Sequence, residues 1–247
     1  MKIYIGQKEL MMNRITMFSM IFCIVSLNGV FASGRKEGNG DVVLINRGIS
    51  SFNSIELSSK ALVNIYQNDT DKVTVEIDSN LEQFVKTNIR NNTLEIGEKV
   101  GVSLNPNKYT INVYVKNISR IKVSGQGNVN INNVLETDNI ELKISGSGKI
   151  GGKIESNNLV ADISGSGEIN ISGVCPQIEL KISGSGNINT PDMDVESALV
   201  EISGSGETKI DVKRELIGRI SGSGNIFYKG TPKIEVNISG KGGIKGI

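Results

Sequence analysis

The chain contains no histidine and no tryptophan, and aromatic residues make up only 4% of its 247 residues. Without histidine, a His-based catalytic triad and a His-ligated metal site are excluded. Beyond residue 32 the aromatic side chains are Phe52, Phe84, Phe227, Tyr66, Tyr109, Tyr114 and Tyr228. So few rings leave little for stacking against sugars, and we expect Tyr109 and Tyr114 to pack across strands or into the core.

The chain also lacks an excess of charge of one sign, and it has only two cysteines. The 27 basic and 26 acidic residues give a net charge of +1, so nothing indicates a nucleic-acid surface. The two cysteines are Cys23 and Cys175, and Cys23 lacks the small preceding residue of a lipobox. If residues 1–32 are removed, Cys175 is alone and no intrachain disulfide can form. We expect Cys175 to be buried and inert, or otherwise to make an intermolecular link.

The N-terminal residues are typical of a secretory signal peptide that spans residues 1–32. A weakly basic start precedes an apolar stretch, and Val30-Phe31-Ala32 offers a cleavage site. A second methionine start would make residues 1–10 a misassigned upstream extension. Cleavage removes three basic and one acidic side chain, which changes the net charge from +1 to −1. We therefore expect an exported protein in the periplasm, on the cell surface or at the outer membrane, with no transmembrane segment after cleavage.

What the chain does contain is a repeat. The pattern [Val/Ile]-Ser-Gly-x-Gly occurs seven times, with its serines at Ser124, Ser145, Ser164, Ser183, Ser203, Ser221 and Ser239. The intervals are 21, 19, 19, 20, 18 and 18 residues. A unit of about twenty residues cannot bury its own apolar side chains, so it becomes stable only when neighbouring units stack on it.

Each unit has the pattern of two short strands joined at a glycine-rich corner. In residues 140–159 apolar and charged side chains alternate up to Ser145, which is typical of a half-buried strand, and a second strand follows the glycines. When the copies are aligned, aliphatic residues recur one and three positions before the motif serine and five positions after it. Thr208 and Gly218 are the departures from this pattern. The sequence therefore predicts an all-β fold, a right-handed parallel β-helix (β-solenoid) of about 18–21 residues per coil.

The first half fits the same architecture less regularly. Residues 55–65 resemble one unit, with Ser58 in the place of the motif serine, 66 residues before Ser124. That interval leaves room for about three coils, with strand-like runs at 73–77, 93–96 and 109–115 and a short helix or loop at 81–89. After a linker at residues 33–44 we expect one solenoid domain at 45–247, irregular to about residue 117. Two sub-domains divided near residue 117 are the alternative.

Two features carry a resemblance to a known family. The Gly-Asn-Ile that follows several corners (Gly186-Asn187-Ile188, Gly224-Asn225-Ile226) is similar to a "GIN" repeat, and so is the segment at 47–55. Together they resemble the putative auto-transporter adhesin, head GIN domain family of bacterial envelope proteins, over roughly residues 45–240. The resemblance implies a β-helix-like fold and a surface or periplasmic location. It implies no known ligand and no catalytic residues.

The glycine-rich corners do not fit the usual chemical motifs. A phosphate loop would open a helix, whereas the corners open strands. A calcium-binding roll needs a repeated aspartate, but the residue after the corner varies between asparagine, lysine and glutamate. The acidic residues Asp192, Asp194 and Glu196 follow a proline and are expected to form a charged loop tip. We therefore expect no metal, no cofactor and no catalytic site.

One polar row remains a candidate for binding. The residue between the two corner glycines would form a ridge about 20–30 Å long, given the rise per coil; the ridge consists of Gln126, Ser147, Ser166, Ser185, Ser205, Ser223 and Lys241. The sequence thus favours a non-enzymatic adhesion or ligand-binding module whose partner is a glycan or an envelope or host surface protein. The alternatives are a carbohydrate-active enzyme of the β-helix type and a structural periplasmic protein. The open ends of the solenoid must be capped or paired: Phe227-Tyr228 and the glycine-rich tail are candidates to cap the C-terminal end, and a homo-oligomer through the ends is the alternative.

Overall fold

The computed structural model describes residues 34–247 of the chain, and the folded unit begins at Arg35. The predicted signal peptide lies outside the described residues. The folded unit begins earlier than the predicted residue 45, because strands β1 (Gly34–Glu37) and β2 (Val42–Arg47) already occupy the predicted linker. No division appears near residue 117, so the alternative of two sub-domains is wrong.

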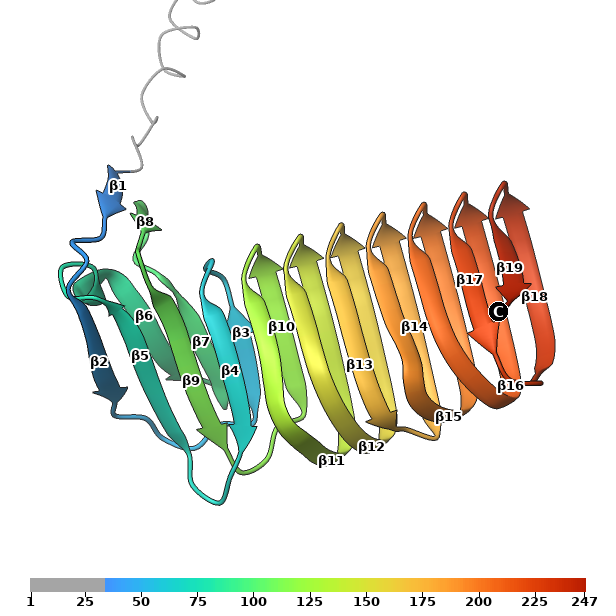
Figure 1. Cartoon of the computed structure of the whole chain (residues 1–247), viewed down its shortest axis with the longest axis horizontal. Coiled ribbons are helices and arrows are strands. Elements are labelled where there is room, and N and C mark those ends of the chain that lie inside the picture. Colours follow the sequence, from blue (N-terminus) through green and yellow to red (C-terminus); the bar gives the residue numbers. More distant parts are fainter. Residues whose placement is uncertain (1–33) are drawn as a thin grey trace, which may run out of the picture. The chain divides into compact units, whose positions relative to one another are not determined.

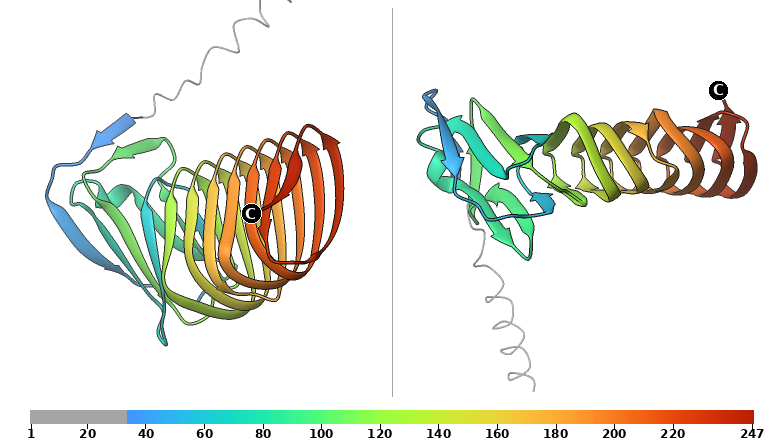
Figure 2. Two further views of the ribbon diagram at one scale, coloured as in Figure 1. Left: turned by 45° about the vertical axis from the view of Figure 1, so that its right-hand side comes forward. Right: turned by 90° about the horizontal axis from the view of Figure 1, so that it is seen from below.

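Strands make up almost all of this unit, which is drawn from two further sides in Figure 2. The N-terminal part continues with β3 (Ser54–Leu57), β4 (Leu62–Gln67), β5 (Lys72–Asp78), the 3-10 turn η1 (Glu82–Phe84), β6 (Val85–Arg90), β7 (Thr93–Glu98), β8 (Val102–Asn105) and β9 (Tyr109–Val115). The repeats contain β10 (Arg120–Gly125), β11 (Asn128–Gly146), β12 (Lys149–Gly165), β13 (Glu168–Val174), β14 (Gln177–Gly184), β15 (Asn187–Gly204), β16 (Glu207–Gly222), β17 (Asn225–Lys229), β18 (Lys233–Gly240) and β19 (Gly243–Gly246).

The repeats stack as parallel coils in register, as predicted (Figure 1). Each motif serine opposes the serine of the next coil, for example Ser145 opposite Ser164 and Ser164 opposite Ser183. Every coil has a first leg that runs into the Ser-Gly-x-Gly corner and a second leg that leaves it. We call the outer surfaces of the stacked legs the first-leg face and the second-leg face.

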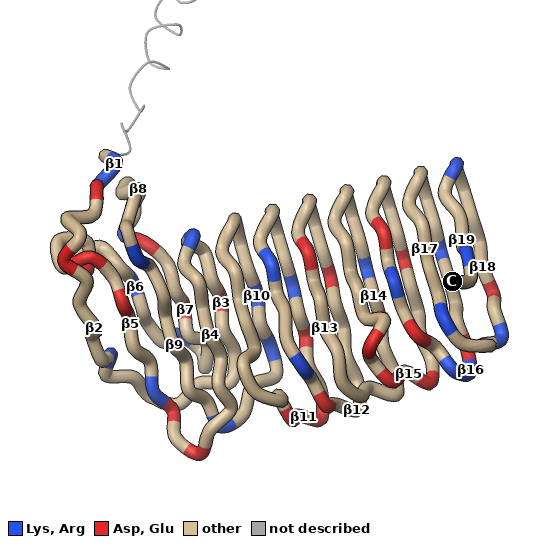
Figure 3. Tube along the Cα trace, in the orientation of Figure 1, with Lys and Arg blue, Asp and Glu red and all other residues tan. Residues whose placement is uncertain are grey.

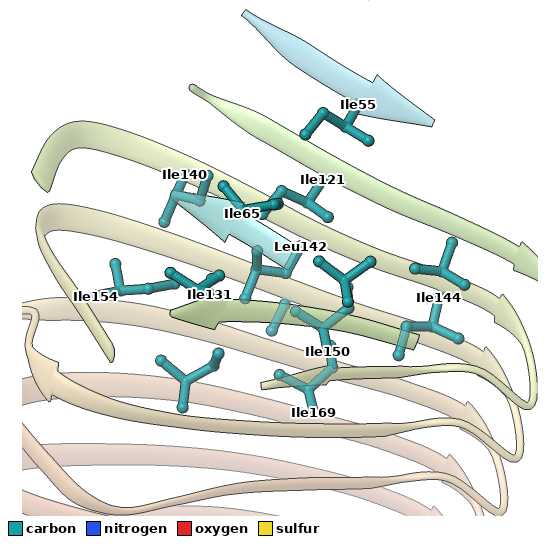
Figure 4. Close-up of a cluster of buried hydrophobic side chains, with 14 of the residues drawn as sticks. Ile55, Ile65, Ile121, Ile131, Ile140, Leu142, Ile144, Ile150, Ile154 and Ile169 are labelled. Carbon is teal, nitrogen blue, oxygen red and sulfur yellow. The ribbon is translucent and has the colours of Figure 1, made fainter. Parts of the chain in front are cut away.

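The core lies between the two legs and consists of the predicted aliphatic columns. Ile144 and Ile163 in the first legs and Ile150 and Ile169 in the second legs are fully buried. Figure 4 shows several of these side chains facing one another across the interior. Gly218 departs from its column because an added Cβ would lie 3.1 Å from Ile226 Cδ1 and from a methyl group of Val236. Larger neighbours therefore fill that position.

The two glycines of each corner are required for different reasons. Gly165, the first glycine of its corner, has φ +129° and lies against the carbonyl oxygen of Gly146 in the previous coil. Gly167, the second, has no such φ; an added Cβ there would lie 2.5 Å from Ile144 Cγ2. The first glycine thus permits the bend, and the second lets the core side chain of the previous coil reach the corner.

The order of the coils differs from the predicted one. Strand β3 pairs with β10 on one side and with β7 on the other, and β4 lies between β11 and β9. The coil that contains Ser58 is therefore the direct neighbour of the coil that contains Ser124. Residues 68–119 fold on its far side, so the expectation of three coils in the interval is wrong.

The N-terminal end of the solenoid also contains antiparallel pairs. Strand β2 pairs with β5, β5 with β9, and β6 with β7, all antiparallel. The segment at 81–89, expected as a short helix or loop, contains η1 and then β6. Antiparallel strands at this end interrupt the row of parallel edges that could otherwise pair with a further coil.

Thr208 offers a test of the core columns. Its side chain is fully buried in the column of Ile188 and Ile226, and its hydroxyl has no hydrogen-bond partner. We expect Thr208→Val to raise the free energy of unfolding by about 1 kcal/mol, because an unsatisfied buried hydroxyl is removed. Thr190→Val is the matched control, since the Thr190 hydroxyl is also buried but donates to the carbonyl of Lys209 at 3.3 Å. Urea unfolding measures both; equal changes in the two variants would contradict the assignment.

Candidate binding surfaces

The predicted ridge is assembled as a continuous row along the corners. From Ser147 to Lys241 the backbone N–H of each ridge residue donates to the carbonyl oxygen of the first corner glycine of the previous coil, for example Ser166 to Gly146 and Ser185 to Gly165, both at 2.9 Å. The five serines are exposed, as are Gln126 and Lys241 at the two ends. The structure thus brings all seven predicted residues together, while a ligand for them remains a prediction.

A second row of hydroxyls runs beside this ridge. The motif serines themselves point out of the first legs and are exposed in the regular coils, and they flank a shallow groove of about 470 Å³. Ser183, Ser203 and Ser221 line one side of the groove and Lys181, Glu201 and Arg219 line the other. The corner therefore offers two parallel lines of hydroxyl groups rather than the single predicted one.

The charged side of that groove is a ladder in which charges compensate each other from coil to coil. The residues in register along the first-leg face are Glu95, Glu56, Lys122, Lys143, Asp162, Lys181, Glu201 and Arg219, which we call the charge ladder. Ion pairs join Lys122 to Glu56 and Lys143 to Asp162, each at 2.7 Å, and Arg219 to Glu201 at 2.5 Å. Figure 3 shows basic and acidic positions close together along the coils. This face therefore carries no field of one sign.

A further hollow lies at the opposite turn of the coils, away from the Ser-Gly-x-Gly corners. It has a volume of about 740 Å³, and Glu136, Asp138 and Glu155 line it together with Pro176. Asn157 donates a side-chain hydrogen bond to Asp138 at 3.2 Å, and Glu155 is 3.5 Å from Lys153. Within residues 34–247 no group of three or more acidic or cysteine side chains is placed to hold a metal ion.

The acidic cluster at 192–196 does not lie in this hollow. It belongs to strand β15, not to the expected loop, although the register shifts there. Asp192 and Asp194 are exposed, and Asp194 makes an ion pair with Lys213 at 2.5 Å. Hydrogen bonding to Asp194 raises the pKa of Lys213. The cluster is therefore part of the solvated outer surface.

A further hollow of about 580 Å³ lies at the N-terminal end of the first-leg face. Lys86, Glu95 and Lys99 line it, and Val100, which is fully exposed, stands at its rim. Lys86 pairs with Glu95 at 2.7 Å, and the hydrogen bond from Lys86 lowers the pKa of Glu95. Glu98 at its edge has a raised pKa because it is partly buried.

Tyr109, Tyr114 and Cys175 occupy positions expected of structural residues, and Tyr66 stacks on Tyr114. Tyr109 is buried in the core, where burial raises its pKa to about 12. Tyr114 lies on the second-leg face and stacks on Tyr66, with 5.1 Å between the ring centroids. Cys175 is buried, as predicted, and its thiol donates to the carbonyl of Gln177. Burial raises the pKa of this thiol, so it is held as an unreactive group.

The sequence did not reveal a row of amide side chains on the second-leg face. Asn130, Asn170 and Asn189 each follow a motif serine by six residues, which the aligned copies could have shown. The same row continues through Asn64 and Asn112, and their membership depends on the unexpected order of the N-terminal coils. This row is uncharged, in contrast to the charge ladder on the opposite face.

No helix in the described part of the chain has the length and apolar character needed to cross a membrane.

Solved structures with the same fold come from Parabacteroides and Bacteroides species. A protein described as a putative lipid binding protein from Parabacteroides distasonis is 26% identical, with a TM-score of 0.74 over 87% of this chain and 100% of its own. A putative adhesin from Parabacteroides merdae is 25% identical, with a TM-score of 0.74 over 86% of this chain and 99% of its own. A putative adhesin from Bacteroides fragilis is 22% identical, with a TM-score of 0.82 over 86% of this chain and 100% of its own.

Among curated proteins no match is found. Residues 51–232 match the family described as "Putative auto-transporter adhesin, head GIN domain". This segment covers well over half of the 247 residues and contains all but the last of the Ser-Gly-x-Gly corners. The resemblance seen in the sequence is therefore confirmed, and the chain belongs to the putative auto-transporter adhesin, head GIN domain family.

Proposed function

We propose that this chain is an exported adhesion or ligand-binding module of the bacterial envelope, which holds its ligand on the lateral surface of a rigid solenoid and performs no catalysis. The observation that carries the proposal is the alignment of like side chains in long rows on the outer surface. A ligand laid along such a row makes the same contact in each coil, which suits a repetitive partner. The adhesin names of the family and of structural neighbours support this function.

Export is part of the same proposal. It rests on the signal-like residues 1–32 and on the family. The alternative of a carbohydrate-active enzyme draws no support from the acidic cluster, because Asp194 is paired with Lys213 on an exposed surface.

Cell fractionation and protease shaving of intact cells test the location. In the fractionation we expect the mature chain in the envelope fraction. In the shaving experiment, a chain on the cell surface is degraded when protease is added to intact cells. Recovery of the chain only from the cytoplasm would contradict export. Retention of the purified protein on a panel of glycans and envelope or matrix proteins tests binding; failure to bind any member, with intact fold by circular dichroism, would contradict the binding function.

Lipid binding is a second candidate because of one specific feature. Three aliphatic side chains, Val160, Leu199 and Ile217, point outward on the first-leg face at positions where the neighbouring coils have charged residues, and they line a hollow of about 280 Å³. A structural neighbour that is 26% identical is described as a putative lipid binding protein. Flotation with lipid vesicles separates this candidate from the first: co-flotation that Leu199→Ser abolishes would favour it.

A further inference from the structure

The second-leg face carries an uninterrupted uncharged row across its N-terminal two thirds. In spatial order, the row consists of Asn46, Thr74, Asn112, Asn64, Asn130, Gly151, Asn170 and Asn189, each opposite the next on adjacent strands. We call it the amide row. With about 4.8 Å between strands it extends over roughly 30–35 Å along the solenoid.

Neighbouring amides in the row are joined by hydrogen bonds. Asn64 donates to Asn112 at 3.0 Å and Asn189 to Asn170 at 2.8 Å, and Asn112 contacts the Thr74 hydroxyl at 3.4 Å. Each bond uses one donor and one acceptor, and an asparagine side chain has further donor and acceptor capacity. Each bond donates toward the N-terminal end of the row, and the amides remain exposed or partly exposed, whereas Thr74 is buried beneath its neighbours.

Asparagine is a poor choice for the middle of a strand if stability is the only requirement. It is depleted in strands, whereas threonine and other β-branched residues are favoured there. The strands of this chain obey that preference in the core, where isoleucine, valine and leucine dominate. The hydrogen bonds between coils account for part of the repeated asparagine at this outward register, as in other asparagine ladders. They do not use the remaining donors and acceptors of the amides.

The outward-facing aromatic side chains lie on the same face. Tyr66 and Tyr114 belong to the strands of Asn64 and Asn112 and stack two residues further along them. Phe227 lies at the same register near the other end of the solenoid, separated from Asn189 by Lys209. Among the aromatic residues of the described part, Phe52 and Tyr109 are buried, and Phe84 and Tyr228 pack against the core. Aromatic and amide groups are thus concentrated on one surface.

We propose that the second-leg face binds an uncharged polysaccharide chain that lies along the amide row; this inference rests on the proposed binding function. Sugar hydroxyls both donate and accept hydrogen bonds, as amides do, and the C–H faces of sugar rings pack against aromatic rings. The amide row itself contains no charge and ends before Lys209, which is in register after Asn189. The charged residues beside the row, Lys149 and Glu168, are paired with each other at 2.7 Å, so an uncharged ligand leaves neither of them without a partner. A chain of repeating sugars meets equivalent amides in successive coils.

The test compares two variants of the full protein that change opposite faces. Asn64→Thr, Asn112→Thr and Asn130→Thr together remove three central amides and introduce a residue that strands favour. The control, Lys143→Thr with Asp162→Thr, removes one ion pair from the charge ladder on the first-leg face. Thermal unfolding establishes that both variants fold; if the triple variant does not, Asn112→Thr alone takes its place.

Affinity electrophoresis in gels that contain β-glucan, xylan or mannan, and in gels that contain polygalacturonate or heparin, measures binding. We expect the wild type to be retarded by at least one uncharged polysaccharide, also in about 1 M salt, where charge interactions are screened within about 3 Å. The affinity of the triple asparagine variant should be lower than that of the wild type by a factor of about ten or more, as is typical when central interface residues are truncated. The charge-ladder control should bind like the wild type.

Three results would overturn the proposal: retardation only by the charged polysaccharides, loss of binding in the control but not in the asparagine variant, or no retardation in any gel. In the last case, retention of the same protein on an envelope or matrix protein, unchanged in the asparagine variant, would leave the binding function standing and refute only the polysaccharide site.

Discussion

Gly165→Ala is expected to lower the free energy of unfolding by about 3 kcal/mol or more. Gly165 has φ +129°, where a residue with a side chain costs about 1–3 kcal/mol. An added Cβ would also lie 2.5 Å from the carbonyl oxygen of Gly146, which is backbone and cannot rotate away. The coil would have to shift, and the hydrogen bond from Ser166 to that carbonyl would be strained.

Thermal unfolding measures this effect. For a domain of this size we expect a decrease in Tm of roughly 6–12 °C, from about 2–4 °C per kcal/mol. Gly151→Ala is the matched control, because Gly151 has no left-handed φ and an added Cβ would only touch the Asn170 carbonyl oxygen at 3.5 Å. That variant should be neutral or slightly stabilising, since alanine restricts the unfolded chain. Similar Tm values for the two variants would show that the corner does not need its glycine.

The regular coils could be predicted from the sequence because their information is local and repeated. Seven copies of the corner fix the period, and the aliphatic positions around Ile144 and Ile150 fix which side of each strand is buried. Parallel stacking then follows, since a twenty-residue unit buries its apolar side only against the next unit. The different reasons for Gly165 and Gly167 could not be predicted, because they depend on atoms of the preceding coil.

The N-terminal coils were harder because neighbours in space are not neighbours in sequence. The coil of Ser58 was recognised, but residues 68–119 lack the corner motif, so no alignment could assign them to a side of it. Alternation of apolar and polar side chains along these strands fits an antiparallel pair as well as a parallel one. In the structure β5 pairs antiparallel with both β2 and β9. The amide row was missed for the same reason, since Asn64 and Asn112 join it only through this order.

Asp78 provides the second large effect, at the N-terminal end. Its carboxylate is fully buried and accepts hydrogen bonds from Gly40 N–H at 2.7 Å and from the N–H and side chain of Asn107 at 2.8 Å each. Asp78→Ala removes three hydrogen bonds to a buried carboxylate, and hydrogen bonds to a charged group contribute about 1.5–3 kcal/mol each. We expect a loss of about 3 kcal/mol or more in urea unfolding, whereas Asp69→Ala, at an exposed position, should change stability by less than about 0.5 kcal/mol.

The stabilisation by Asp78 should also depend on pH in one direction. Burial tends to raise its pKa, but the hydrogen bonds from Asn107, Gly40 and Lys108 outweigh it and hold the pKa below its ordinary value of 3.8. A carboxyl whose pKa is lower in the folded protein stabilises the fold above the unfolded value and loses this effect as pH falls through the folded value. The difference in unfolding free energy between the wild type and Asp78→Asn should therefore be constant from pH 7 to about pH 5 and shrink below about pH 4. If this difference in unfolding free energy stays constant down to pH 2, the charge of the Asp78 carboxylate does not stabilise the packing of the loop at Asn107 against this end of the solenoid.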